Sequence, residues 1–137
     1  MNILAGKTIL VVDDEKKIAH ELQVTLEKSG FQVTVAYDGD EALEKVQEAK
    51  PDLVILDLLM PRVDGWTVLQ EIRDGEITKD VPVVVLTVVS EPQSIVHGWR
   101  KGVDSYLCKP CDPVEMVALV NRMLKLRDEE QLADAAT

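Results

Sequence analysis

Five residues with reactive side chains stand at the ends of short apolar runs in this 137-residue chain. In chain order they are Asp13, Asp14, Asp57, Thr87 and Lys109. Clustered carboxylates repel one another unless a cation joins them, and carboxylates with water suit a hard divalent ion, most simply Mg²⁺. A magnesium ion with a hydroxyl and an ammonium beside it forms a cradle for a phosphoryl group.

Asp57 is the carboxylate best suited to act as a nucleophile, as aspartate does in proteins that form aspartyl-phosphate. It ends an apolar run on its own, whereas Asp13 and Asp14 come as a pair. Each residue also has an ordinary structural interpretation, because paired acids are common in turns and helix caps. The phosphoryl hypothesis therefore depends on all the reactive residues falling at equivalent strand ends.

The elements that would position these residues are five apolar runs, at 8–12, 31–36, 52–57, 81–87 and 105–108. Three are continuous and rich in Val, Ile and Leu, which is typical of strands buried on both faces of a parallel sheet. The run at 31–36 alternates between apolar and polar residues, as an edge strand does.

Helical spacing of apolar residues fills the gaps between the runs, with helices expected at 15–29, after Asp38-Gly39, around 66–72, from Ser90 and from Asp112. The alternation predicts an α/β fold, a (βα)5 doubly wound parallel five-stranded sheet in the flavodoxin-like order 2-1-3-4-5. Strands 1 and 3 are neighbours in that order, so the three carboxylates would share one small space.

Composition indicates a single soluble domain. The formal net charge of −10 argues against nonspecific binding to nucleic acid or to anionic membranes. No apolar run resembles a signal peptide or a membrane span, so we expect a cytoplasmic protein. The apolar period fades after residue 126. We therefore expect a domain at 1–126 and a C-terminal tail or the start of a linker at 127–137.

The stretch SYLCKPCDP at 105–113 permits a different function, a redox-responsive module that uses Cys108 and Cys111. Cys111 precedes a predicted helix, and a helix N-terminus can lower the pKa of a thiol. Thioredoxin-type motifs normally follow an early strand, however, whereas this one follows the last. Cys108 is better explained as a strand residue that fills the core.

Two further classes fit the residues less well. A flavin carrier of this fold would need a phosphate-binding loop after the first strand, but the loop VVDDEKK is acidic and lacks glycine. Phosphohydrolases with an aspartate nucleophile usually carry a second aspartate two residues later, where Leu59 stands here. Turnover as an enzyme is therefore not expected.

The sequence resembles the receiver domain of two-component response regulators over roughly residues 7–126. The matching segments are ILVVDDE (9–15), DLVILDLLMPRVDGW (52–66), VVVLT (83–87) and DSYLCKP (104–110). The resemblance implies that Asp57 accepts a phosphoryl group from a sensor histidine kinase, a phosphotransfer protein or a small acyl phosphate. It implies a signalling switch, with self-phosphorylation from donors and slow autodephosphorylation as its only reactions.

The resemblance also implies a set of Mg²⁺ ligands. Asp14 and Asp57 resemble the direct ligands, and Asp13 resembles the one that usually acts through water. The backbone carbonyl of Leu59 is the expected third protein ligand.

The remaining implied roles concern the switch. Thr87 and Lys109 would contact the phosphoryl oxygens, and Tyr106 matches the aromatic residue that changes rotamer when the threonine moves. The Lys109-Pro110 peptide bond resembles one that is usually cis in the family. The helix 4–strand 5–helix 5 face would then repack and signal to a partner or output domain, without direct nucleic-acid contact. Trp99 could contribute to that face or belong to the core, and a phosphorylation-dependent dimer is a further option.

Four residues depart from the family pattern. Val88 replaces a small residue after Thr87 and could narrow access for the phosphodonor. Leu59 and Val89 are apolar at the two positions that commonly flank the approach of the hydrolytic water. Apolar side chains cannot orient a water molecule, so we hypothesise slow autodephosphorylation. Cys111 replaces a common phenylalanine, so packing under the last helix could differ.

Overall fold

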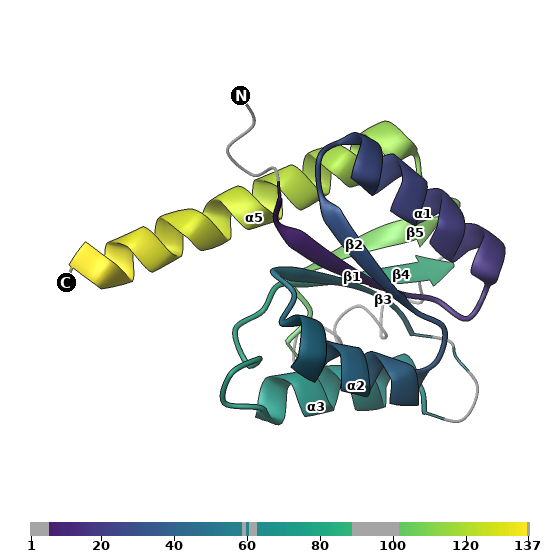
Figure 1. Cartoon of the computed structure of the whole chain (residues 1–137), viewed down its shortest axis with the longest axis horizontal. Coiled ribbons are helices and arrows are strands. Elements are labelled where there is room, and N and C mark those ends of the chain that lie inside the picture. The colour runs from purple at the N-terminus through teal and green to yellow at the C-terminus, as the bar shows by residue number, and fades with distance from the viewer. Residues whose placement is uncertain (1–5, 59, 61–62, 89–101, 137) are drawn as a thin grey trace.

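The computed structural model describes residues 6–58, 60, 63–88 and 102–136, with the backbone alone at 87–88 and 134–136. Five parallel strands form one sheet in the order β2-β1-β3-β4-β5 (Figure 1). They are β1 Thr8–Val12, β2 Gln32–Ala36, β3 Leu53–Asp57, β4 Val83–Val88 and β5 Ser105–Lys109. The predicted parallel sheet, its strand order and the edge position of the second strand are confirmed.

Helices cover both faces of this sheet. Within the described residues they are α1 Lys16–Lys28, α2 Gly39–Ala49, α3 Gly65–Asp74 and α5 Pro113–Ala136. Figure 1 shows α1 and α5 on one face and α2 and α3 on the other, which is the doubly wound arrangement. The helix expected from Ser90, which would carry Trp99, falls outside the described residues.

The core consists of two apolar layers that the strands divide between them. In β1, Leu10 and Val12 point toward α2 and α3, whereas Ile9 and Val11 point toward α1 and α5. The same alternation runs through β3 and β4, and all five residues of β3 are buried. Strands buried on both faces explain the continuous apolar runs of the sequence. This packing fixes the strand ends from which the reactive residues project.

The last helix extends past the point where the apolar period fades. α5 continues to Ala136, and Figure 1 shows it projecting beyond the sheet. Arg127 Nη1 donates to the Asp52 carbonyl at 2.6 Å, and Lys7 Nζ lies 3.1 Å from Asp128 Oδ1. Residues 127–136 are therefore helical in the structure, while the domain boundary at 126 stays a prediction.

Candidate functional site

The reactive residues lie at the carboxyl edge of the sheet. Val12 is aligned with Ala36 on one side and with Leu56 on the other, so Asp13 and Asp57 leave neighbouring strands at the same level. The Asp13 amide donates to the Ala36 carbonyl at 3.1 Å and so holds the end of β1 against β2. This is the topological switch point, where open α/β sheets bind their ligands.

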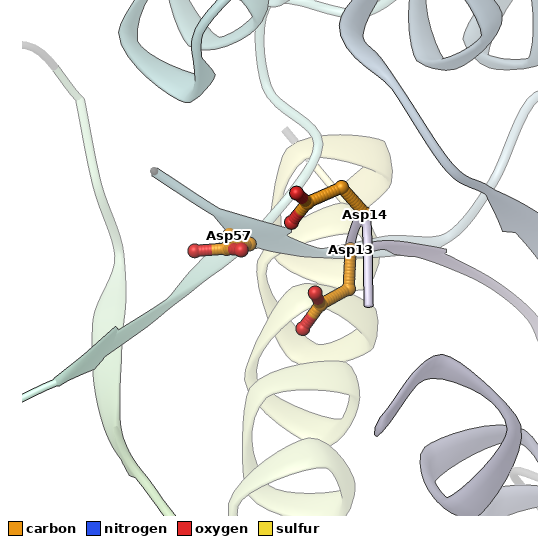
Figure 2. A group of neighbouring side chains, drawn as sticks. All are labelled: Asp13, Asp14 and Asp57. Atoms are coloured by element: carbon orange, nitrogen blue, oxygen red, sulfur yellow. The ribbon is translucent and has the colours of Figure 1, made fainter. Parts of the chain in front are cut away.

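Three carboxylates meet there, as the sequence predicts. Oxygens of Asp13, Asp14 and Asp57 all lie within 4.8 Å of one another (Figure 2). Asp13 is fully buried, Asp57 is nearly so, and Asp14 is exposed. Two of these carboxylates are buried and one is exposed, so a cation from solvent can reach the cluster through Asp14.

Lys109 brings an ammonium into this cluster from the end of β5. Its Nζ lies 2.9 Å from Asp13 Oδ2 and 3.3 Å from Asp57 Oδ2, to which it donates a hydrogen bond. Burial alone would lower the pKa of Lys109, but the carboxylates of Asp13 and Asp57 outweigh it and the net shift is upward. The peptide bond between Lys109 and Pro110 is cis, as the family resemblance led us to expect.

The charges and hydrogen bonds of the cluster fit a divalent cation. Asp13 Oδ1 accepts from the Glu15 amide at 3.0 Å, but the buried Oδ2 accepts no aligned hydrogen bond, although the Lys109 ammonium is near it. Three carboxylates against one ammonium leave an excess of negative charge. A divalent ion with oxygen ligands would balance this excess, as Mg²⁺ does in carboxylate sites.

The loop after Asp57 is packed against the site through a glycine that the sequence analysis did not single out. A Cβ on Gly65 would lie 2.5 Å from the Asp57 carbonyl oxygen and 2.5 Å from the Leu58 Cα. The Gly65 amide donates to the Leu58 carbonyl at 3.0 Å, and Asp64 caps α3 by accepting from the Thr67 amide. The sequence shows only an Asp-Gly pair before a predicted helix. The need for glycine depends on the close approach of Gly65 to the backbone of Asp57 and Leu58, which the sequence does not reveal.

Three residues of the predicted site are described only in part or not at all: the switch residue Thr87, the ligand Leu59 and Val89, which is predicted to flank the approach of the hydrolytic water. The Thr87 backbone lies in β4 opposite Cys108, while its side chain falls outside the described residues, as do Leu59 and Val89. Tyr106 is partly buried against the core on the α2–α3 side, and burial raises the pKa of its hydroxyl. Tyr106 lies on β5, the neighbour of the strand that carries Thr87, and the switch role of both residues stays a prediction.

The two cysteines differ from what the sequence led us to expect. Both are free thiols, and Cys108 is exposed instead of filling the core, because β5 is an edge strand and its side chains are less covered than those of β3. Burial raises the pKa of the Cys111 thiol, even though the nearby Lys109 ammonium acts in the opposite direction. A raised pKa disfavours the reactive thiolate, so the structure gives the redox alternative no support.

Comparisons with known proteins agree with this geometry. The response regulator receiver domain family matches residues 9–121. The chain is 40% identical over 120 residues to the DNA-binding dual master transcriptional regulator RpaA of Synechocystis, which covers 88% of this chain and 50% of RpaA. It is 42% identical over 120 residues to the alkaline phosphatase synthesis transcriptional regulatory protein PhoP of Bacillus subtilis, covering 88% of this chain and 49% of PhoP.

Solved structures show the same fold. A putative response regulator from Chloroflexus aurantiacus matches with a TM-score of 0.83 and 34% identity, over 88% of this chain and 98% of the other. The chemotaxis protein CheY4 of Vibrio cholerae matches with a TM-score of 0.83 and 32% identity, over 87% and 99%. None of the helices in the described part of the chain has the length and apolar character needed to cross a membrane. The chain spans about half the length of the curated relatives it matches, and it belongs to the receiver-domain family of two-component response regulators.

Proposed function

We propose that this receiver accepts a phosphoryl group on Asp57 in a Mg²⁺-dependent reaction. The donor is a sensor histidine kinase, a phosphotransfer protein or a small acyl phosphate. One observation supports the proposal above all. Asp57, two further carboxylates and the Lys109 ammonium lie close together at the carboxyl ends of the strands. A nucleophile, a cation site and a fixed positive charge are the parts that phosphoryl transfer needs.

Each residue has a distinct part in this proposal. A carboxylate oxygen of Asp57 attacks the phosphorus of the donor, and the bond from phosphorus to the donor's histidine nitrogen or acyl oxygen breaks, so that the imidazole or the carboxylate leaves with the bonding electrons. Asp14 and Asp57 would hold the cation directly, and Asp13 would hold it through water. Mg²⁺, when bound, neutralises negative charge on the phosphoryl oxygens. Lys109 lies close enough to Asp57 to contact a phosphoryl oxygen attached there. The Leu59 carbonyl completes the ligand set in the proposal, on the strength of the family resemblance.

The output is a change of shape. A phosphoryl group adds about 1.5 to 2 negative charges and three strong acceptor oxygens. In the proposal Thr87 moves toward these oxygens, Tyr106 follows, and the helix 4–strand 5–helix 5 face repacks to signal to a partner or an output domain. RpaA is named as a DNA-binding protein. For this chain, whose net charge is −10, we propose no direct contact with nucleic acid.

Intact-mass measurement tests the acceptor. The chain is incubated with acetyl phosphate and Mg²⁺, and we expect a gain of one phosphoryl group, about 80 Da, in the wild type. Asp57→Asn should show no gain, and chelation of Mg²⁺ should abolish the gain in the wild type. The matched control is Asp80→Asn, an exposed aspartate remote from the site, which should be phosphorylated like the wild type. A full gain in Asp57→Asn would refute the assignment.

A further inference from the structure

Glu15 lies beside the site but outside the carboxylate cluster. The Lys109 Nζ is 3.7 Å from Glu15 Oε1, in addition to its closer contacts with Asp13 and Asp57. The ammonium therefore faces three carboxylates, and only two of them belong to the proposed cation site. The third is mounted on a different element, the start of α1.

The local structure does not employ the Glu15 side chain for helix capping. Glu15 occupies the N-cap position of α1, where Ser, Thr, Asp and Asn are preferred because their short side chains bond to the first helical amides. Its own side chain makes no such bond, and its amide is used to hold Asp13 Oδ1. The carboxylate is 61% exposed and directed toward Lys109. The Glu15 side chain at the N-cap position therefore contacts Lys109 and does not cap the helix.

A divalent cation and the Lys109 ammonium compete for the same oxygens. Lys109 now lies against Asp13 and Asp57, which are also members of the cation cluster. Two cations a few ångströms apart repel strongly where water is largely excluded. When a cation takes these carboxylates, the ammonium must give up part of its pairing with them. Glu15 also lies next to the ammonium, and its carboxylate is not part of the proposed cation site.

We propose that Glu15 is a positioning residue that keeps the Lys109 ammonium at the rim of the site while a divalent cation occupies the cluster of Asp13, Asp14 and Asp57. This inference rests on the proposed cation site. When the cation draws the Asp13 and Asp57 carboxylates away from Lys109, the Glu15 carboxylate still balances the positive charge of the ammonium. Cation binding therefore costs less free energy, and the ammonium stays directed at the incoming phosphoryl group. Because Glu15 is largely exposed, solvent screens its charge, and its loss should weaken Mg²⁺ binding only about two- to five-fold.

Calorimetric titration of the full chain with Mg²⁺ tests the proposal. We expect Glu15→Gln to raise the Kd for Mg²⁺ about two- to five-fold. Glu21→Gln removes the same charge from an exposed position on the same helix and should change the Kd less. In a Lys109→Met background the effect of Glu15→Gln should disappear, since a double-mutant cycle isolates action through the lysine.

NMR supplies a second measurement that leaves Lys109 in place. At saturating Mg²⁺ the ε-CH₂ resonances of Lys109 should differ between wild type and Glu15→Gln and agree between wild type and Glu21→Gln. Equal Kd changes in the two glutamate variants, an undiminished effect in the Lys109→Met background, or identical Lys109 resonances would overturn the role of Glu15 alone. Failure of the wild type to bind Mg²⁺ would instead remove the cation site itself, and with it the proposed function.

Discussion

Asp14 offers a test of the electrostatics at the site, because its replacement should stabilise the fold. Its carboxylate lies within 4.8 Å of those of Asp13 and Asp57, and it is exposed. At this separation each like-charged pair costs about 0.9 kcal/mol in water and about 3.5 kcal/mol at an effective dielectric of 20. The exposure of Asp14 favours the lower figure. Two such pairs give roughly 2 kcal/mol of repulsion that Asp14→Asn would relieve when no divalent cation is present.

Urea denaturation with and without Mg²⁺ measures this effect. Without Mg²⁺, the free energy of unfolding should be about 1–3 kcal/mol higher for Asp14→Asn than for the wild type. Mg²⁺ at ten times its Kd should stabilise the wild type by about 1.4 kcal/mol and the variant by much less. Asp80→Asn, a remote exposed control, should behave like the wild type in both conditions.

Two results would refute this reasoning. An Asp14→Asn variant that is no more stable than the wild type without Mg²⁺ would show that the carboxylates do not repel appreciably in the folded chain. An equal Mg²⁺-dependent gain in both proteins would show that Asp14 does not contribute to cation binding.

Three further predictions concern other parts of the site. Gly65→Ala should lower the free energy of unfolding by about 1–3 kcal/mol, because the added Cβ meets backbone atoms on Asp57 and Leu58 that cannot move away freely; denaturation measures the loss, and wild-type stability would contradict it. Leu59→Asn should shorten the lifetime of the phosphorylated form, since an amide can orient water and an apolar side chain cannot; equal lifetimes by intact mass would reject the hypothesis. Cys111 should react with iodoacetamide more slowly than the exposed Cys108 at neutral pH, because burial raises the pKa of its thiol; peptide mapping that finds Cys111 alkylated first would disagree.

The sequence predicts the sheet well because burial on both faces leaves a strong signal. β3 is buried at every position, and its apolar run ends at the residue where the strand ends. The chain order of strands and helices then restricts the topology, and the order places Asp13 and Asp57 on neighbouring strands. The carboxylate cluster could therefore be predicted from strand ends alone.

Contacts between distant segments leave no comparable signal. The exposure of Cys108 depends on which neighbours cover an edge strand, and the spacing role of Gly65 depends on how closely one loop approaches another. The reach of Glu15 to Lys109 joins residues 94 positions apart, from 15 to 109, and depends on side-chain direction. The spacing of apolar residues shows which face of a helix or strand a residue occupies. It does not show which distant segment packs against that face.

The pairing of Lys109 explains how this edge of the sheet can be stable and still retain a charge that favours the proposed cation. A buried carboxylate without a partner is costly, and Asp13 meets this cost through the ammonium and the Glu15 amide. Yet one ammonium cannot neutralise three carboxylates, and Asp13 Oδ2 still lacks an aligned hydrogen bond. Side chains and amides of the chain therefore balance the charge and hydrogen bonding of this carboxylate cluster only in part. The excess negative charge is what a divalent cation would balance, so the same imbalance that limits the stability of the fold favours the cation binding that we propose.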